Sequence, residues 1–205
     1  MTTPSPVRRL KTGERRGQLL DAATVAFARG GFAATGLDDI AAEAGITRAV
    51  LYRHFDSKTE LYTSVLDRMC ARLDAHIDQP DEGFRDDSID GLLAVAVESP
   101  AGFRLLFQHA LREPEFKERV EMFRSDVAEA AYGQITRIVA DPALARWAAN
   151  AAPTVAIDAV IAWLDAGQPD PSRAAARIRR VVIGVVEAAL LDGDATLPAQ
   201  PARRP

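Results

Sequence analysis

The sequence predicts an all-α protein, and three observations support this fold class. Apolar residues recur at steps of three and four along most of the chain, which is the period of one helix face. Alanine, a strong helix former, occurs 38 times among the 205 residues, whereas aromatic residues make up 6%. Glycines, prolines and capping residues stand at the ends of the periodic stretches. We therefore expect an N-terminal three-helix domain followed by a helical body.

The composition is that of an ordinary globular chain, with 48% hydrophobic and 26% charged residues. No stretch approaches the roughly 18 uncharged apolar residues of a membrane span, and the polar N-terminus lacks the apolar segment of a secretory signal. Cys70 is the single cysteine, which excludes an intrachain disulfide. We therefore expect a protein of the reducing cytoplasm with no membrane span.

The first predicted helix spans residues 13–29. Leu19, Ala23 and Phe27 recur at four-residue steps and give this helix one apolar stripe, which predicts a buried face. The glycine pair at 30–31 is expected to end the helix, because glycine adopts the left-handed backbone of a helix end without a steric penalty.

Two short helices are predicted next, joined by a glycine turn. Thr35 is expected to cap the second helix, with Asp38 at the capping-box spacing, and Gly45 ends that helix. Thr47 is then expected to cap a third helix over residues 48–54. Two short helices joined by a three-residue turn have the spacing of a helix-turn-helix.

A fourth, long helix is expected to begin at the capping box Ser57-Lys58-Thr59-Glu60 and to fade near Ile77. The valine-rich run at 181–186 keeps helical steps with its flanks, so we assign it to the last helix rather than to a strand. Pro153 should kink or split the helix that contains it. The later helices are predicted at residues 88–98, 101–112, 115–139, 143–165 and 172–191.

We divide the chain at residues 60 and 191. Residues 1–60 hold the helix-turn-helix domain with a basic N-terminal arm, residues 61–191 a helical body, and residues 192–205 an aperiodic, disordered tail. Residues 1–60 carry nine Lys/Arg against seven Asp/Glu, whereas the remainder carries 16 against 22. A cationic end on an anionic body favours orientation towards a polyanion; the alternative is that the N-terminal arginines only solvate a terminus.

Residues 47–54 have side chains suited to a helix lying in the major groove of DNA. Thr47, Arg48 and Ala49 occupy the leading turn, where arginine can donate to a guanine edge and the short side chains can contact phosphate, a base edge or a thymine methyl. The alternatives are that Arg48 is an idle surface arginine and that Arg53 pairs with a carboxylate. Further candidate contacts to phosphate oxygens are Thr35, Tyr52, Arg53, His54 and Lys58.

These residues resemble the DNA-binding domain of the TetR (tetracycline repressor) family over roughly residues 12–62. The resemblance is more specific than a bare helix-turn-helix, because a Tyr-x-His-Phe element and the following lysine are in register. Ala49 and Gly36 depart from the family pattern, which often has glycine and a polar residue at these places. The matching stretches are Gly31-Phe32-Ala33-Ala34-Thr35, Ile40-Ala41, Ala44-Gly45-Ile46-Thr47, Leu51-Tyr52-Arg53-His54-Phe55, Ser57-Lys58 and Glu60-Leu61.

The resemblance implies a homodimer with two N-terminal DNA-binding domains and C-terminal helical domains for ligand binding and dimerisation. Proteins of this family are usually repressors that release a pseudo-palindromic operator when a small molecule binds. The implied partners are therefore double-stranded operator DNA, a second copy of the chain and an unidentified small-molecule effector, with no cofactor.

The helical body contains two sets of candidate residues. An apolar pocket with a polar anchor could be lined by Phe103, Phe107, His109, Met122, Phe123 and Trp147, with ordinary core packing as the alternative. A two-fold dimer needs a self-complementary face, which the last two long helices could supply unless both stripes cover the chain's own core. The candidate interface residues are Ala159, Val160, Trp163, Val181, Val182, Val185 and Val186.

No catalytic or metal site is indicated. The three histidines, at positions 54, 76 and 109, are far apart in sequence, Cys70 stands alone, and no nucleophile-elbow or phosphate-binding glycine motif occurs. The sequence therefore predicts a non-enzymatic DNA-binding regulator, most simply a repressor. The alternatives are a helical protein adaptor and a small-molecule-binding protein whose N-terminal domain does not bind DNA.

Overall fold

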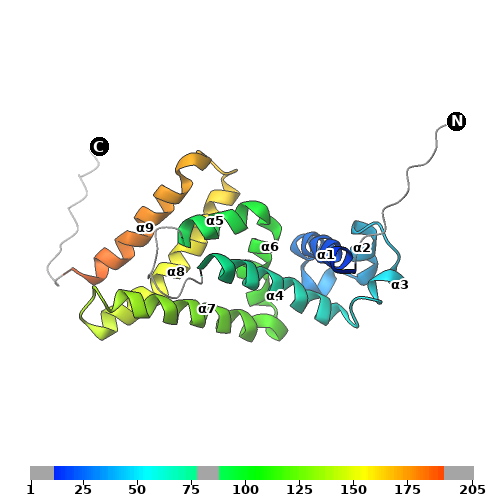
Figure 1. Cartoon of the computed structure of the whole chain (residues 1–205), viewed down its shortest axis with the longest axis horizontal. Helices are drawn as coiled ribbons and strands as arrows, with labels where there is room; N and C mark the ends of the chain where they lie inside the picture. Colours follow the sequence, from blue (N-terminus) through cyan, green and yellow to red (C-terminus); the bar gives the residue numbers. More distant parts are fainter. Residues whose placement is uncertain (1–11, 78–87, 192–205) are drawn as a thin grey trace, which may run out of the picture. The chain divides into compact units, whose positions relative to one another are not determined.

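The computed structural model describes residues 12–77 and 88–191, and every regular element in these two ranges is helical (Figure 1). The predicted all-α class is therefore confirmed, while the predicted basic arm and disordered tail lie outside the described residues. The helices are α1 (Thr12–Ala34), α2 (Leu37–Glu43), α3 (Arg48–Leu51), α4 (Lys58–Ile77), α5 (Ser88–Glu98), α6 (Pro100–Arg104), α7 (Pro114–Ile135), α8 (Pro142–Asp165) and α9 (Ala174–Ala189), with a π turn η1 (Leu105–His109) and 3₁₀ turns η2 (Ala110–Arg112) and η3 (Pro171–Arg173).

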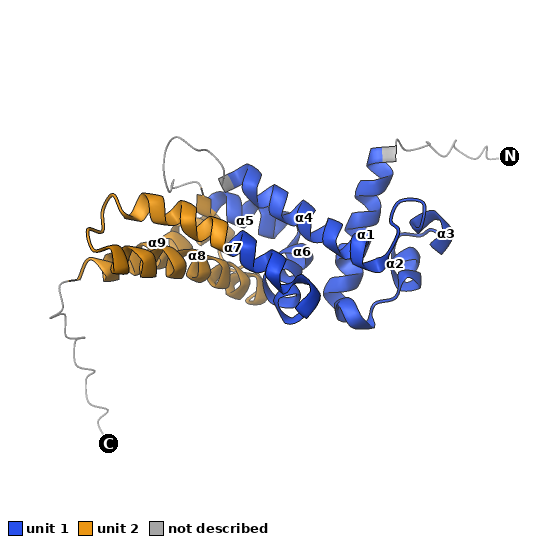
Figure 2. Ribbon diagram, turned by 90° about the horizontal axis from the view of Figure 1, so that it is seen from below, with its two compact units in different colours: residues 1–81, 90–124 blue, residues 82–89, 125–205 orange. Residues whose placement is uncertain are grey.

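The chain forms two compact units, which Figure 2 colours separately: residues 1–81 with 90–124, and residues 82–89 with 125–205. The first unit contains the helix-turn-helix and α4 and α6, and the second contains α8 and α9. The boundary between the two compact units does not fall at residue 60. α4 begins at Lys58 and lies against both α1 and α6 inside the first unit. The division of the chain at residue 60 stays a prediction about function.

The core of the first unit is built on the predicted stripe of α1. Leu19, Ala23 and Phe27 are buried there, as their spacing predicts. The ring of Tyr62, on α4, lies 4.8 Å from the ring of Phe27 and 4.3 Å from the ring of Phe116, on α7. These aromatic contacts join three helices around one buried cluster.

α1 is interrupted at Gly31, whose φ of 75° and ψ of 170° are not helical. A positive φ is a conformation that favours glycine, so the break occurs at the predicted glycine pair. The predicted end at residue 29 is nevertheless too early, because the chain makes one further turn to Ala34 after the break.

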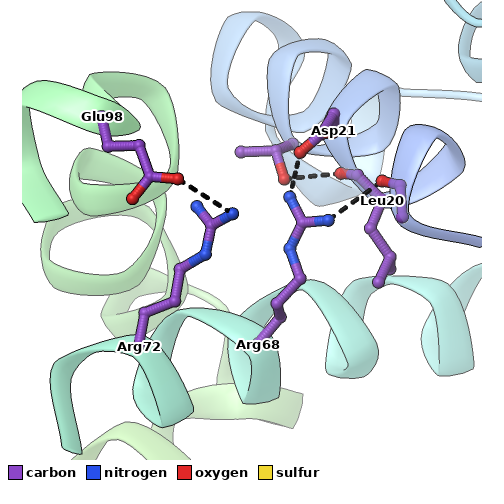
Figure 3. A network of polar contacts seen from close by, with 7 residues as sticks. Leu20, Asp21, Arg68, Arg72 and Glu98 are labelled. Atoms are coloured by element: carbon purple, nitrogen blue, oxygen red, sulfur yellow. Dashed lines mark hydrogen bonds and ion pairs between the residues drawn. The ribbon is translucent and has the colours of Figure 1, made fainter. Parts of the chain in front are cut away.

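Two arginines of α4 hold neighbouring helices of the first unit (Figure 3). Arg68 donates to the Gly17 carbonyl of α1 at 2.9 Å and forms an ion pair with Asp21 of the same helix. Arg72 places a guanidinium nitrogen 3.3 Å from the Glu98 carboxylate of α5. α4 is thus tied to the helix that supports the helix-turn-helix.

The predicted helical segment over 101–112 is helical throughout, but it is not one regular α-helix. α6 ends early and is followed by the π turn η1, in which the Ala110 N–H donates to the Leu105 carbonyl five residues back. Leu105, Leu106 and Phe107 are all buried in this turn. Three consecutive buried side chains cover more than one face of a helix, so periodicity alone did not reveal the wider turn.

The second unit is built on an alanine-rich core between α8 and α9. Ala145, Ala148 and Ala149 of α8 have no exposed area, which allows close packing of the neighbouring helices. Pro153 lies inside α8, which runs as one helix from Pro142 to Asp165, so the expected split does not occur.

Two further assignments concern the helices of the second unit. By length and composition α8 could cross a bilayer, the single such helix in the described ranges. Nine of its side chains are buried in the folded chain, which is the pattern of a core helix. The valine-rich run at 181–186 lies in α9, so its assignment to a helix rather than a strand is confirmed.

Candidate DNA-binding surface

α2 and α3 are joined by a tight turn at Gly45, whose φ of 63° suits glycine. The Ile46 N–H donates to the Ala41 carbonyl at 2.9 Å and closes this turn. Ile40, Ala41 and Leu51 are buried and hold the two short helices on the core of the first unit. The predicted helix-turn-helix is therefore confirmed.

The third helix was predicted over 48–54, but α3 ends at Leu51. The chain continues to turn beyond it, because the Arg53 N–H donates to the Val50 carbonyl at 3.2 Å and the His54 N–H to the Leu51 carbonyl at 3.0 Å. These bonds span three residues rather than four, as in the tightened last turn of many helices.

The leading turn of α3 is open to solvent. Thr47, Arg48 and Ala49 are all exposed. Thr47 takes the predicted N-cap position, with φ −89° and ψ 153°, although its hydroxyl makes no capping bond. Its side chain and that of Ala49 are therefore free to meet a ligand at this turn.

Arg48 lies between a carboxylate and a phenol. Its Nη1 is 3.1 Å from Oδ2 of Asp38 on α2, its Nη2 donates to the Tyr52 hydroxyl at 3.0 Å, and its Cζ lies 5.4 Å from the centre of the Tyr52 ring. The hydrogen bond to Tyr52 and the negative charge of Asp38 raise the pKa of Arg48. Sequence reasoning assigned Asp38 to a helix cap and missed this contact.

The turn after α3 presents two more candidate residues. Arg53 is exposed and His54 is half-buried. Phe55 is buried behind them, and the guanidinium of Arg16, on α1, lies 4.5 Å from its ring centre while donating to the Ser64 hydroxyl at 3.2 Å. α1 and α4 thus support the segment that carries Arg53 and His54.

The predicted role of Thr35 as the cap of α2 is wrong. Gly36 occupies the N-cap position, and its N–H donates to the Asp39 carboxylate at 2.7 Å. The Thr35 hydroxyl donates instead to the Gly31 carbonyl at 2.7 Å, with the Ala26 carbonyl 3.3 Å away. Thr35 is 5% exposed, so the structure places it inside the protein and not on the exposed surface with Arg48.

The Lys58 ammonium group makes two of its contacts inside the protein, to main-chain carbonyls. Its Nζ donates to the Phe32 carbonyl at 2.9 Å and to the Ala33 carbonyl at 3.4 Å, and it lies 4.4 Å from the centre of the Phe32 ring. The predicted capping box supports its position, because the Glu60 N–H donates to the Ser57 hydroxyl at 3.0 Å.

Of the six candidate pocket residues, the structure groups three. The rings of Phe103 and Phe107 are 4.8 Å apart and buried, and the Phe123 ring centre lies 6.3 Å from that of Phe107. Met122 and Trp147 are 62% and 49% exposed, so neither is enclosed by its own unit.

Two polar side chains belong to the elements that carry these rings. His109, the predicted polar anchor, is half-buried in η1. Arg124 of α7 places its guanidinium 5.7 Å from the centre of the Phe107 ring, and its Nε is buried. Sequence reasoning missed this cation, because residues 107 and 124 lie on different elements with no shared period.

The seven candidate interface residues differ in exposure. Val160 and Val182 are buried in the core of the second unit, whereas Val181 is 52% exposed. The Trp163 indole donates to the Pro169 carbonyl at 2.9 Å. The half-buried members are Ala159, Trp163, Val185 and Val186.

The described residues, 12–77 and 88–191, offer neither a metal site nor an activated cysteine. No three His, Cys, Asp or Glu side chains in these ranges are grouped so that they could hold a metal ion. Burial, with the nearby Asp74 and Asp67 carboxylates, raises the pKa of Cys70 to about 11. Its thiol is therefore protonated near neutral pH, the opposite of an activated nucleophile.

A helix-turn-helix with an exposed, arginine-bearing leading turn defines a class of DNA-binding proteins. The family model described as "Bacterial regulatory proteins, tetR family" matches residues 19–65. The HTH-type transcriptional activator FasR of Mycolicibacterium smegmatis is 32% identical over 78% of this chain and 77% of its own length. The HTH-type transcriptional repressor SCO4008 of Streptomyces coelicolor is 33% identical over 62% of this chain and 68% of its own length.

This chain belongs to the TetR family and is a DNA-binding transcriptional regulator. A solved TetR-like regulator from Rhodococcus sp. RHA1 has the same fold, with a TM-score of 0.74 and 21% identity over 89% of this chain and 98% of that one. The resemblance to this family is therefore confirmed, and neither the protein adaptor nor the small-molecule-binding protein that does not bind DNA is favoured.

Proposed function

We propose that the chain acts as a homodimer that binds a pseudo-palindromic operator in the cytoplasm and represses transcription until a small-molecule effector releases it. The observation that carries this proposal is the exposed leading turn Thr47–Arg48–Ala49 within the family-matched helix-turn-helix. Each copy would place α3 in the major groove, with the two copies roughly 34–36 Å apart, about one turn of DNA.

The contact roles follow from side-chain chemistry and exposure. Arg48 would donate to a guanine edge, and Ala49 would meet a thymine methyl. Tyr52 and Arg53, both exposed, would donate to phosphate oxygens, with His54 beside them. Lys58 has one ammonium proton beyond its two carbonyl contacts, which is available to a phosphate. Thr35 is left out of this set because it is buried.

The outer face of α9 supports dimerisation. Val181 is exposed on it, and Gly184 has no atom within 4 Å of the position that a Cβ would take. Packing inside the unit therefore does not require glycine there, although glycine in a helix costs about 1 kcal/mol relative to alanine. Close approach of α9 from a second copy accounts for that cost, and α8 and α9 of both copies would form a four-helix bundle.

The effector would act through the helical body. The aromatic group of Phe103, Phe107 and Phe123, with the Arg124 guanidinium beside the Phe107 ring, supports an effector with an apolar part and a hydrogen-bonding group. Such a ligand releases DNA only to the extent that it binds the DNA-incompetent conformation more tightly.

Activation is a second candidate, which the relative FasR favours because it is named a transcriptional activator and matches most of this chain. A reporter with the selected binding site at a promoter separates the two. Expression that falls when the protein is present supports repression, and expression that rises supports activation.

The decisive experiment is selection from a randomised duplex library by the purified full-length protein at low ionic strength. We expect enrichment of a two-fold symmetric site and a dimer by analytical ultracentrifugation. A monomer, or a library that remains random after selection, contradicts the proposal. When the same selection is repeated with Arg48→Ala, the matched control variant is Arg146→Ala, because this exposed arginine pairs with Glu129 outside the helix-turn-helix.

A further inference from the structure

We propose that Asp38 is a positioning residue that sets the base preference of Arg48 and disfavours binding to unrelated DNA. The proposal rests on the proposed function of Arg48 as the base-reading residue. Neither the family match nor the names of the relatives assign a role to Asp38.

Asp38 and Tyr52 hold the Arg48 guanidinium at two separate nitrogens. Nη1 lies 3.1 Å from the Asp38 carboxylate, and Nη2 donates to the Tyr52 hydroxyl at 3.0 Å. Asp38 stands in the first turn of α2, and Arg48 begins α3, so the ion pair crosses the turn of the helix-turn-helix. The two contacts therefore link the guanidinium to α2 and to the C-cap residue of α3.

The ion pair is poorly placed to stabilise the fold. The two side chains are 75% and 52% exposed, and solvent-exposed ion pairs contribute little to folding. Asp38 also places a negative charge on the surface that would face the phosphate backbone, where it opposes binding. A carboxylate at this position is thus explained better by selectivity than by stability or by overall DNA affinity.

Holding the guanidinium changes what it can recognise. Arginine has more N–H donors than these two contacts use, so the fork can still donate to a guanine edge. An arginine held at two points loses less side-chain freedom when it makes this contact. A freely rotating arginine, in contrast, can donate to any phosphate oxygen, and the negative charge of Asp38 disfavours that contact.

The experiment uses the full-length protein with two duplexes, the site selected by the unaltered protein and a shuffled version of it. Affinities are measured by fluorescence anisotropy for Asp38→Asn, Arg48→Ala and the double variant. Glu129→Gln is the matched control, because Glu129 pairs with Arg146 in the second unit as Asp38 pairs with Arg48. Circular dichroism melting checks that each variant folds.

We expect Asp38→Asn to bind the shuffled duplex more tightly and to lower the ratio of specific to non-specific affinity by at least about threefold. Repeated selection with this variant should relax the base preference at the position that Arg48→Ala also relaxes. In the Arg48→Ala background the same substitution should leave the ratio nearly unchanged, and Glu129→Gln should leave it unchanged altogether.

Two results would overturn this inference and leave the proposed function intact. One is an unchanged ratio of specific to non-specific affinity in Asp38→Asn, and the other is an equal drop of that ratio with and without Arg48. Either would show that Asp38 acts only as a general surface charge. If the unaltered protein enriches no sequence at all, the proposed function fails as well. The two failures are therefore distinguishable.

Discussion

Within the two described ranges, two exposed arginines each meet a carboxylate and a tyrosine, one in each compact unit. In the first unit, Arg48 is 3.1 Å from Asp38 and lies 5.4 Å from the Tyr52 ring centre. In the second unit, Arg146 is 2.6 Å from the Glu129 carboxylate and lies only 3.6 Å from the centre of the Tyr132 ring. Hydrogen bonds and carboxylate charge raise the pKa of both arginines.

The difference between the two groups is in how the guanidinium is held. Arg146 lies close to the face of its tyrosine, a cation–π arrangement that covers one face of the guanidinium. Arg48 stands farther from the ring and donates to the hydroxyl at its edge, and its side chain is 52% exposed against 46% for Arg146. Each group links two helices through an arginine and a carboxylate, Asp38 in the first unit and Glu129 in the second, but only the first group stands at the leading turn of the helix-turn-helix.

Replacing each arginine by alanine should give the clearest contrast between the two groups. We expect Arg48→Ala to lower affinity for the selected site by roughly five- to hundredfold and to relax one base-pair preference, because a base-edge contact is lost. Arg146→Ala should leave DNA affinity unchanged. Fluorescence anisotropy on the selected and shuffled duplexes measures both, and equal effects of the two substitutions would refute the assignment of Arg48.

The features that could be predicted from sequence are local ones. The helix-turn-helix follows from local spacing, since Gly45 and the buried positions around it lie within a few residues of one another. α5 matches its predicted range of 88–98 for the same reason. The pairing of Arg48 with Asp38 could not be predicted, because periodicity reports which face is buried and not which carboxylate an exposed arginine meets across a turn.

The error at Thr35 has a similar physical origin. A threonine three residues before an aspartate has the local signature of a cap, but the break at Gly31 leaves a carbonyl close to the Thr35 hydroxyl. The hydroxyl bonds to that carbonyl, and Gly36 takes the cap position. The signal depended on a backbone conformation that residue types alone do not fix.

Thr35 provides a test of a helix-turn-helix residue that supports the fold and does not face DNA. Thr35→Val should lower the free energy of unfolding by about 1–2 kcal/mol, because it removes a buried hydroxyl that donates to a main-chain carbonyl. Thr154→Val is the matched control, an exposed threonine that donates to the carbonyl four residues back in the same way. Urea unfolding gives both values; a changed base preference in folded Thr35→Val would contradict this role.

Lys58 supports the fold through main-chain contacts and is also proposed to contact phosphate. Its substitution should therefore change stability and DNA affinity, which are measured separately. Lys58→Met should lower the free energy of unfolding by about 1 kcal/mol through the lost carbonyl contacts at Phe32 and Ala33. If its remaining proton meets a phosphate, all duplexes should weaken alike and the slope of log affinity against log salt should fall by about 1. Lys117→Met, which replaces an exposed lysine on α7, is the control and should change neither quantity. A change in base preference would contradict the phosphate role.

The smallest expected effect is that of removing the Tyr52 hydroxyl, which is the second contact of the Arg48 guanidinium. Tyr52→Phe removes the acceptor for Arg48 Nη2 and keeps the ring, so the guanidinium is held by Asp38 alone. We expect a two- to threefold loss of preference for the selected site over the shuffled one, roughly what one exposed hydrogen bond contributes. Tyr132→Phe keeps the ring that Arg146 covers and should leave DNA binding unchanged. The phosphate contact proposed for the same hydroxyl would weaken both duplexes alike, so an unchanged ratio of the two affinities would show that the hydroxyl acts only on phosphate and not on the orientation of Arg48.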